Sequence, residues 1–307
     1  MQKLLNYMNQ RVKSAISQAG GIFNETVEIR LRINSPVLVR TTKSELFLDS
    51  SIIINKKDIG DIVGNLTKNS IHAFENEISK GYLTIEGGHR VGISGDCIYD
   101  KDRLKGFKNI TSLNIRIARE FQGCSDKSLK HLISSDKKIY NTLIVGPPLS
   151  GKTTLIRDVA RNLSDGFSSP YFEGCDVTII DERGEISAVY MGVPQMNTGR
   201  RTDVLSYCRK SDGFFMSIRA LSPRVIISDE LGSVDDFEII QYALKSGVKI
   251  IATAHGFSLD DIKRNVYLKN IIENNFFERA FILNKRPSKL KEVFDFQSRR
   301  VIYNDMD

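Results

Sequence analysis

The stretch best suited to chemistry is a loop with the spacing G-x-x-x-x-G-K-[ST], made up of Gly146, Pro147, Pro148, Leu149, Ser150, Gly151, Lys152 and Thr153. Glycines let backbone N–H groups approach phosphate oxygens closely, and a helix starting here would add the positive end of its dipole. Lys152 would meet the β- and γ-phosphates of ATP, and the Thr153 hydroxyl would hold Mg²⁺. Thr154 follows directly and completes the predicted ATP-binding set.

The flanking residues decide between a phosphate-binding loop and a Gly/Pro-rich turn that contains Lys-Thr by chance. Residues 142–145 are an apolar run expected to form a buried strand, and residues 154–163 are expected to form a helix. Strand, loop and helix in this order are the context in which the pattern has structural meaning. We therefore predict an ATP site at 146–154.

A pair of carboxylates follows the nearly apolar run 225–228. Asp229 is predicted to hold Mg²⁺, usually through water, because Mg²⁺ gives up its water reluctantly. Glu230 is predicted to polarise the attacking water as a general base. The pair lies downstream of Lys152 with one predicted strand, 176–181, between them, which strengthens an assignment that Asp-Glu alone would leave weak.

Two more apolar runs end in polar residues. Residues 181–185 (Asp-Glu-Arg-Gly-Glu) are either a charged loop or a second acidic cluster near the γ-phosphate, with Glu182 and Glu185 as further candidates for the base. His255 ends the run 248–254 and is either a structural histidine or a sensor of the γ-phosphate.

Arginines are candidates for neutralising the charge that develops on the γ-phosphate. Arg200 and Arg201 lie in a loop rich in turn formers and could act as arginine fingers on the ATP of a neighbouring subunit. Arg90, Arg116 and Arg119 lie on or beside predicted strands and could direct guanidinium groups at a phosphate across a domain interface. For all five, the alternative is a solvated surface side chain.

The second half of the chain alternates apolar strands with helical stretches at 211–221, 234–245 and 258–265. This alternation predicts a mostly parallel sheet covered on both faces. Ligands of such sheets bind beyond the carboxyl ends of the strands, where the polar residues described above are found. Thr202-Asp203 is expected to begin a further helix.

The first part of the chain has a different pattern. Residues 1–20 and 57–79 have helical spacing, residues 27–33 alternate apolar and charged side chains, and Gly87-Gly88 is expected to turn a hairpin. We predict a smaller N-terminal α+β domain over 1–122, followed by an α/β ATPase domain over 123–307.

Composition sets limits on the class of protein. The 307 residues carry a formal net charge of +7, but without a long basic run, so nucleic-acid binding is not favoured. No apolar run approaches the ~20 residues of a membrane span, and the N-terminus lacks a secretory signal, so we expect a cytoplasmic protein. The four cysteines form no C-x-x-C pair, which argues against a zinc site or a disulfide framework.

Together these segments resemble the secretion ATPase superfamily, the hexameric motors of type II and type IV secretion and pilus assembly. The matching segments are the loop at 146–153, the acidic box at 181–185, the Walker B segment at 225–230 and the histidine box ending at 255. Five other segments look like those of the stage III sporulation protein AA family: 28–32, 87–92, 114–120, 201–205 and 222–226. In one departure, secretion ATPases usually have Gly-Glu where this chain has Asp229-Glu230, so Asp229 as metal ligand depends on general P-loop chemistry. The chain also lacks the zinc-binding tetracysteine module of some type II secretion ATPases.

The resemblance implies a RecA-like P-loop ATPase domain that hydrolyses ATP with Mg²⁺. It implies a cytoplasmic motor of a secretion-like channel complex used in endospore formation, between mother cell and forespore. It also implies a ring, expected to be a hexamer, that reaches the membrane of the mother cell through membrane-anchored channel proteins. The alternatives are a nucleic-acid-dependent RecA-like motor, suggested by the basic charge and the shared fold, and a nucleotide-switched scaffold with little turnover.

Overall fold

The computed structural model describes residues 2–18, 25–68, 70, 74–79, 81–284 and 289–305. They divide into two compact units. The first comprises Met1–Arg119 together with Ala188–Gln195, and the second comprises Glu120–Ser187 together with Met196–Asp307. Both units combine helices with a sheet, as the predicted α/β class requires. Within the described part of the chain, no helix combines the length and the apolar character needed to cross a bilayer.

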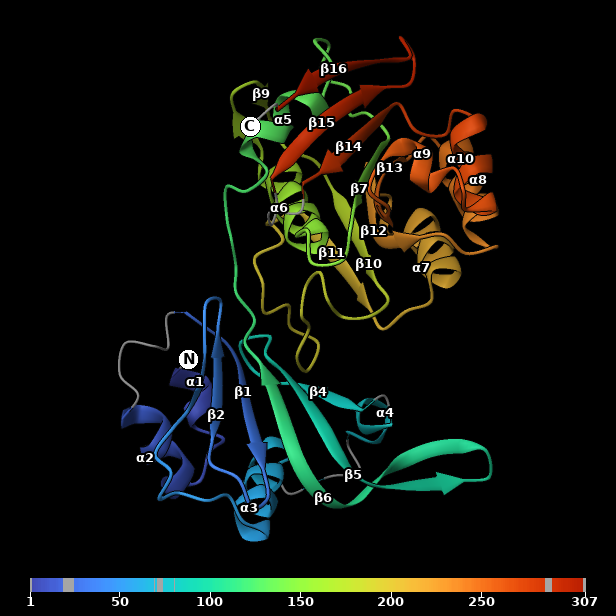
Figure 1. Cartoon of the computed structure of the whole chain (residues 1–307). Coiled ribbons are helices and arrows are strands. Elements are labelled where there is room, and N and C mark those ends of the chain that lie inside the picture. Colours follow the sequence, from blue (N-terminus) through green and yellow to red (C-terminus); the bar gives the residue numbers. More distant parts are fainter. Residues whose placement is uncertain are drawn as a thin grey trace. The chain divides into compact units, whose positions relative to one another are not determined.

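The first unit is built on an antiparallel sheet with the strand order β3-β2-β1-β6-β5-β4 (Figure 1). Its strands are β1 (Thr26–Arg32), β2 (Leu38–Thr41), β3 (Glu45–Phe47), β4 (Tyr82–Thr84), β5 (Arg90–Asp100) and β6 (Arg103–Arg116). Strands β5 and β6 pair from Arg90 to Asp100 and form a long hairpin. The predicted turn at Gly87-Gly88 lies between β4 and β5, and both glycines have positive φ, which favours glycine there.

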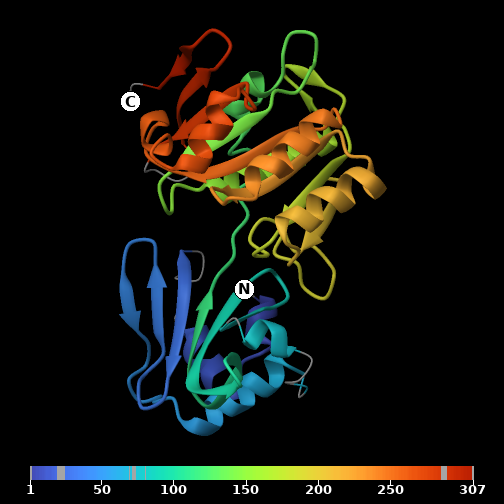
Figure 2. The ribbon, with the colours of Figure 1, turned by 90° about the vertical axis from the view of Figure 1, so that its right-hand side faces the viewer.

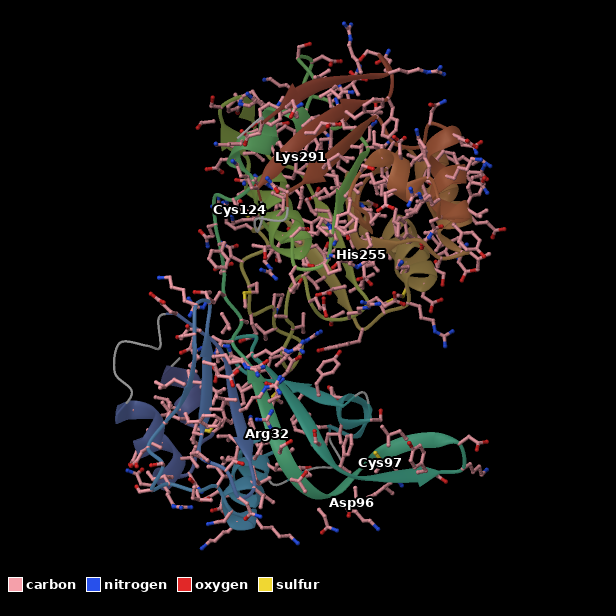
Figure 3. The ribbon with its side chains drawn as sticks, viewed as in Figure 1. Arg32, Asp96, Cys97, Cys124, His255 and Lys291 are labelled. Carbon is pink, nitrogen blue, oxygen red and sulfur yellow. The ribbon has the colours of Figure 1, made fainter. Side chains whose placement is uncertain are left out.

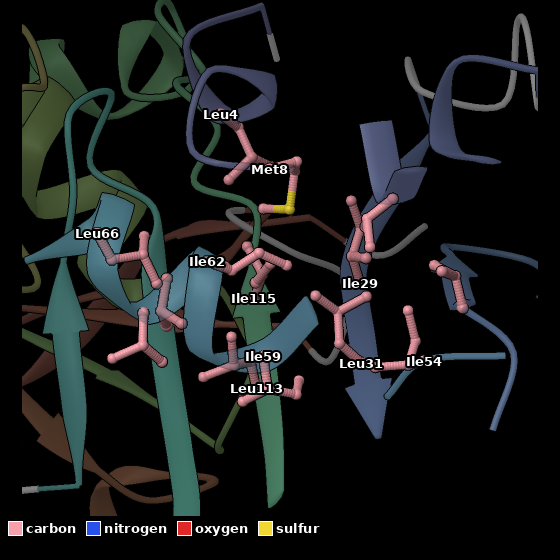
Figure 4. Close-up of a cluster of buried hydrophobic side chains, with 14 of the residues drawn as sticks. Leu4, Met8, Ile29, Leu31, Ile54, Ile59, Ile62, Leu66, Leu113 and Ile115 are labelled. Carbon is pink, nitrogen blue, oxygen red and sulfur yellow. The ribbon is translucent and has the colours of Figure 1, made fainter. Parts of the chain in front are cut away.

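Helices cover one face of this sheet. They are α1 (Gln2–Leu5), α2 (Gln10–Gln18), α3 (Lys56–Leu66) and α4 (Glu75–Ile78). Figure 4 shows side chains of α1, α3, β1 and β6 meeting in one buried cluster, among them Leu4, Ile62, Ile29 and Ile115. The stretches predicted as helical at 1–20 and 57–79 each contain two shorter helices; residues 1, 19, 20, 69 and 71–73 lie outside the described residues.

The second unit contains a larger sheet with the order β11-β10-β12-β13-β7-β14-β15-β16. Its strands are β7 (Thr142–Gly146), β10 (Val177–Asp181), β11 (Thr202–Ser206), β12 (Val225–Leu231), β13 (Lys249–His255), β14 (Arg279–Leu283), β15 (Leu290–Asp295) and β16 (Arg300–Asn304), and a separate pair is β8 (Phe167–Ser168) and β9 (Tyr171–Phe172). Neighbours from β11 to β14 run parallel, and β15 and β16 are antiparallel additions.

Helices lie on both faces of the larger sheet. They are α5 (Asp126–Leu132), α6 (Lys152–Asp165), α7 (Lys210–Met216) with a π-helical continuation at Ser217–Leu221, α8 (Asp236–Lys245), α9 (Leu259–Ile262) and α10 (Val266–Glu273). In Figure 1, α8 and α10 lie to the right of the sheet, and Figure 2 brings that side to the front. Strand β7 shows the consequence: Ile144 packs in the cluster with α6, whereas Leu143 and Val145 pack in the cluster with α8 and α10. Burial on two faces explains why these strands are almost continuously apolar.

Two features of the second unit differ from the sequence analysis. Thr202-Asp203 begins strand β11, not a helix, and this strand pairs in parallel with β10 from Val177↔Thr202 onward. Pairing with a sheet edge has outweighed a local sequence that resembles a helix start. Along the chain, β8, β9 and β11 lie between the phosphate-binding loop and Asp229, in addition to the predicted β10.

The segment Ala188–Gln195 belongs to the first unit although the chain on either side of it belongs to the second. Gln195 Oε1 accepts a hydrogen bond from Gly87 N at 2.8 Å, and Lys68 Nζ lies 3.8 Å from Met191 Sδ. Tyr190 and Val193 exchange backbone hydrogen bonds within the segment. These contacts fix the segment within the first unit.

Candidate active site

The predicted phosphate-binding loop lies between β7 and α6. Gly146 ends β7, and a Cβ at this position would lie 2.4 Å from Ser150 Oγ, so the packing of the loop on itself requires glycine. Gly151 is left-handed, with φ of 85°, directly before α6. Leu149 is 93 % exposed. Ser150 Oγ is buried and has no hydrogen-bond partner among the described residues, as expected for a cradle that receives a polar ligand.

Lys152 is the first residue of α6, and its ammonium group points back across the loop. Nζ donates to Gly146 O at 2.8 Å, to Pro147 O at 3.0 Å and to His255 Nδ1 at 3.2 Å. These contacts engage all three donors of the lysine. Burial lowers the pKa of Lys152, although neighbouring carboxylates act in the opposite direction. A phosphate bound here would take over contacts that Lys152 makes with carbonyl groups of its own loop.

The two predicted metal ligands lie next to each other on α6 and β12. Thr153 Oγ1 donates to Asp229 Oδ2 at 3.0 Å, and Thr253 Oγ1 donates to Asp229 Oδ1. A hydroxyl and a carboxylate are oxygen donors of the kind that Mg²⁺ prefers, and Mg²⁺ usually combines one or two such ligands with waters and phosphate oxygens. The side chains present therefore fit this ion.

Glu230 lies in a bulge of β12. The pairing of β12 with β13 is irregular between Ser228 and Leu231, and Glu230 has a φ of 51°. For a residue other than glycine this conformation costs about 1–3 kcal/mol, and such strain is typical of functional sites. Both carboxylate oxygens are engaged: Oε1 lies 2.7 Å from His255 Nε2, and Oε2 lies 2.6 Å from Arg183 Nη1.

His255, which is labelled in Figure 3, ends β13 and connects the loop to this carboxylate. The lysine ammonium has donors but no acceptor, so the Nδ1 that faces Lys152 is assigned as the unprotonated acceptor. Nε2 then carries the proton and donates to Glu230. One imidazole thus lies between the residue expected to meet phosphate and the residue expected to orient water.

A cleft of about 440 Å³ lies beside these groups. Its lining includes Glu182, Arg183, Lys210, Asp229, Glu230 and His255. The Glu182 side chain is exposed in this lining, so two candidates for the general base, Glu182 and Glu230, reach the same cleft. The mixture of acidic and basic groups in this lining suits a charged ligand.

Asp181 occupies a different position from the one expected of an acidic cluster that faces phosphate. It is 1 % exposed, and its carboxylate accepts hydrogen bonds from the backbone N–H groups of Glu185, Ile186 and Ser187. Burial raises the pKa of Asp181, against the effect of these three donors. Arg157, buried in α6, donates to the carbonyl oxygens of Glu185 and Ile186. The acidic box is therefore a fixed loop that presents Glu182 and Arg183 to the cleft.

The structure does not bring Arg200 and Arg201 to the loop of their own chain. Arg200 N donates to Asp165 Oδ1 at 2.8 Å, and Arg201 Nη1 donates to Ser164 O at 2.7 Å. Asp165 ends the 14-residue helix that Lys152 begins, which places these contacts about 20 Å from the loop. A role toward the ATP of another subunit stays a prediction.

The other three candidate arginines belong to the first unit. The Arg90 guanidinium lies 4.4 Å from the centre of the Tyr82 ring, and Arg119 Nη2 donates to Thr26 O at 2.8 Å. Arg116 is exposed and lies opposite Arg90 in the β5–β6 register. Their role toward a nucleotide likewise stays a prediction.

Sequence reasoning missed three residues that contact the site. Thr253 could have been found, because it precedes His255 by two positions in the same strand. Arg183 lies inside the acidic box but was not singled out, and its position opposite Glu230 depends on how the loop folds. Lys210 donates to the carbonyl oxygen of Glu230 from twenty residues away, and no local pattern marks it.

Comparison with solved structures finds the same fold in an ATPase and in a pilus retraction motor. The ATPase DotB of Yersinia pseudotuberculosis is 13 % identical with a TM-score of 0.61, over 94 % of this chain and 80 % of that one. The pilus retraction motor PilT with bound ADP is 15 % identical with a TM-score of 0.54, over 88 % and 76 % of the two chains. At these identities the likeness concerns the fold alone.

Sequence comparison identifies the family. The family described as "Sporulation stage III, protein AA" matches residues 1–301. Stage III sporulation protein AA of Bacillus subtilis (strain 168) is 38 % identical over 300 residues, which cover 96 % of this chain and 95 % of that protein. The phosphate-binding loop, the carboxylate pair and His255 therefore lie in a chain that belongs to the stage III sporulation protein AA family.

Proposed function

We propose that this chain is a Mg²⁺-dependent ATPase that powers a secretion-like channel complex during endospore formation. The observation that carries the ATPase activity is the convergence of Lys152, Asp229 and Glu230 at one end of one sheet. Family membership supports the role in sporulation. The likeness in fold to a pilus retraction motor and to DotB supports a motor.

In the proposed reaction, Lys152 exchanges its contacts with loop carbonyl groups for phosphate oxygens of ATP. Thr153 and Asp229 would hold Mg²⁺, which when bound supplies positive charge against the phosphates. Glu230 orients the attacking water and accepts its proton. Because His255 contacts both Lys152 and Glu230, the exchange at the lysine changes the hydrogen bonding of the base.

The proposal includes the architecture and the assembly. Residues 123–307, apart from Ala188–Gln195, would form a RecA-like domain with a mostly parallel sheet, and residues 1–122 together with Ala188–Gln195 a smaller α+β domain. A ring, a hexamer as in the secretion ATPases, would bring the candidate arginines of one chain to the ATP of the next: Arg90, Arg116, Arg119, Arg200 and Arg201. A head-to-tail ring places one surface of each subunit against a different surface of its neighbour, as such sharing requires. The chain would act in the mother-cell cytoplasm, and its partners would be membrane-anchored channel proteins.

The test is phosphate release from ATP by the purified chain, with and without Mg²⁺. We expect hydrolysis to need Mg²⁺ and to disappear, together with ATP binding, in Lys152→Ala. The matched control is Lys245→Ala, which changes an exposed lysine in the last turn of α8. Equal turnover in the wild-type protein and Lys152→Ala would contradict the ATPase and favour a scaffold. Stimulation by single-stranded DNA that weakens steeply with salt would favour the nucleic-acid motor.

A further inference from the structure

Glu230 has a backbone conformation that its residue type disfavours. Its φ of 51° lies in the left-handed region, at the point where the pairing of β12 with β13 breaks. A non-glycine residue keeps such a conformation only when the surrounding structure over-determines it. The contacts that do so here come from Thr253, in the strand that ends at His255, and from Lys210, which lies outside the recognised motifs.

The backbone of Glu230 is held on both sides. Its N–H donates to Thr253 Oγ1 at 2.8 Å, and its carbonyl oxygen accepts a hydrogen bond from Lys210 Nζ. Thr253 is buried in the neighbouring strand β13, whereas Lys210 begins α7 with a side chain that is 12 % exposed. Lys210 therefore reaches the strained peptide from a separate element.

Asp236, at the start of α8, fixes the lysine and the residues that follow the bulge. Its Oδ1 lies 3.3 Å from Lys210 Nζ, and its Oδ2 accepts hydrogen bonds from Gly232 N at 2.6 Å and Ser233 N at 2.7 Å. The Asp236 side chain is 1 % exposed. Lys210 and Asp236, here named the Glu230 clamp, thus join α7 and α8 to the bulge of β12.

We propose that Lys210 is a positioning residue for Glu230. By holding the peptide of Glu230 in its left-handed conformation, it keeps the carboxylate against His255 at the cleft. This inference rests on the proposed ATPase function, in which Glu230 orients water. The direct alternative is that Lys210 binds phosphate itself, since it lines the cleft. Asp236 is not among the described residues of that lining, so a substitution there tests the positioning role without removing a group that could bind phosphate.

The test compares turnover with nucleotide affinity in three variants of the full chain. Lys210→Met keeps the aliphatic stem and removes the donor; we expect turnover to fall about tenfold or more while the affinity for fluorescent ADP stays within about threefold. Asp236→Asn should lower turnover in the same direction by a smaller factor, again with the affinity retained. Lys249→Met breaks a more exposed lysine–carboxylate pair, that with Glu278, at the opposite end of β13 and should change neither quantity.

A second measurement places Lys210→Met in a Glu230→Gln background. If Lys210 acts through Glu230, adding Lys210→Met should change the residual turnover of Glu230→Gln by less than about twofold. An undiminished effect in that background, or a loss of ADP affinity in parallel with turnover, would overturn the positioning role.

If Lys210→Met does not fold, turnover and ADP affinity are measured in Asp236→Asn and Lys210→Arg instead. Lys210→Arg keeps a donor and the charge, so we expect it to retain more turnover than Asp236→Asn. Failure of the proposed function is distinguishable from failure of this inference, because wild-type turnover would then equal that of Lys152→Ala.

Discussion

The Nζ atom of Lys152 lies 3.2 Å from Nδ1 of His255, so the phosphate-binding loop and strand β13 meet through one hydrogen bond. The other ring nitrogen lies 2.7 Å from Glu230 Oε1. Movement of the lysine toward a phosphate would therefore alter the group that holds the water-activating carboxylate. The first two predictions separate the contributions of the carboxylate and the imidazole.

Glu230→Gln should bind ATP but hydrolyse it poorly. The amide keeps the shape of the side chain but cannot accept a proton from water, and loss of a general base lowers turnover by roughly 10²-fold or more. Nucleotide affinity and phosphate release, measured on the same preparation, check this. If Glu230→Gln turns over normally, Glu182, which lines the same cleft, becomes the better candidate.

His255→Ala should lower turnover more than it lowers nucleotide affinity. The substitution removes the third acceptor of Lys152 and leaves one carboxylate oxygen of Glu230 without its imidazole partner. We expect turnover to fall roughly tenfold to a hundredfold, since the base loses its orientation. Unchanged turnover at matched nucleotide occupancy would leave His255 with the structural role that the sequence also allowed.

Asp181→Ala should destabilise the second unit. Three backbone N–H groups at 185–187 lose their buried acceptor, which is expected to cost roughly 2–4 kcal/mol. The midpoint of denaturant unfolding measures the loss, with Asp203→Ala, an exposed aspartate on the neighbouring strand β11, as the control. Equal midpoints for the two variants would show that the acidic box does not depend on this carboxylate.

Two histidines, the buried His89 and the half-buried His131, should make the protein less stable as the pH falls from about 6.5 to 4. Burial lowers the pKa of His89 from 6.5 to about 4, and burial lowers that of His131 to about 4 as well. Between these values the unfolded chain binds more protons than the folded one, so acid favours unfolding, and the full contribution is present above pH 6.5. As the pH falls across this range, the melting temperature of the double variant His89→Gln/His131→Gln should fall less steeply than that of the wild type. Parallel curves would rule out these two histidines as the cause.

If the catalytic site is shared between subunits, mixing two inactive chains should restore activity. Some interfaces in a mixture of Glu230→Gln and Arg201→Ala would pair an intact Glu230 with an intact Arg201. Arginine fingers contribute about 10³–10⁵ in rate where they have been measured, so recovery of part of the turnover is expected. Activity per chain should also rise with protein concentration. Flat activity without rescue would leave a self-contained ATPase.

Sequence reasoning performs well where chemistry and local pattern coincide. The apolar runs that end at Gly146 and His255 become the neighbouring strands β7 and β13, with these two residues paired in register. Thr153 and Asp229, each predicted to hold Mg²⁺, lie within hydrogen-bond distance of each other. The sequence alone was enough to predict that these residues lie close together, because parallel strands bring their carboxyl ends to one edge of a sheet.

The sequence is less informative where a role depends on distant contacts. Asp181 and Glu182 are adjacent acidic residues, yet Asp181 is buried and accepts backbone hydrogen bonds, whereas the Glu182 side chain is exposed. Thr202 begins a strand because the edge of β10 is available for pairing, which its neighbours in sequence do not reveal. The contact of Lys210 with Glu230 requires the arrangement of α7, β12 and α8 to be known first.

The membership of Ala188–Gln195 in the first unit has a consequence for dissecting the molecule. The chain passes between the two units at Arg119–Glu120, at Ser187–Ala188 and again at Gln195–Met196. A single proteolytic cut at the first of these positions would separate residues 1–119 from the rest of the chain, but it would leave the Ala188–Gln195 part of the first unit covalently attached to the second unit. A fragment truncated near residue 119 would lack the side chain that accepts the hydrogen bond of Gly87 N, so the native first unit is assembled from two separate stretches of the gene product.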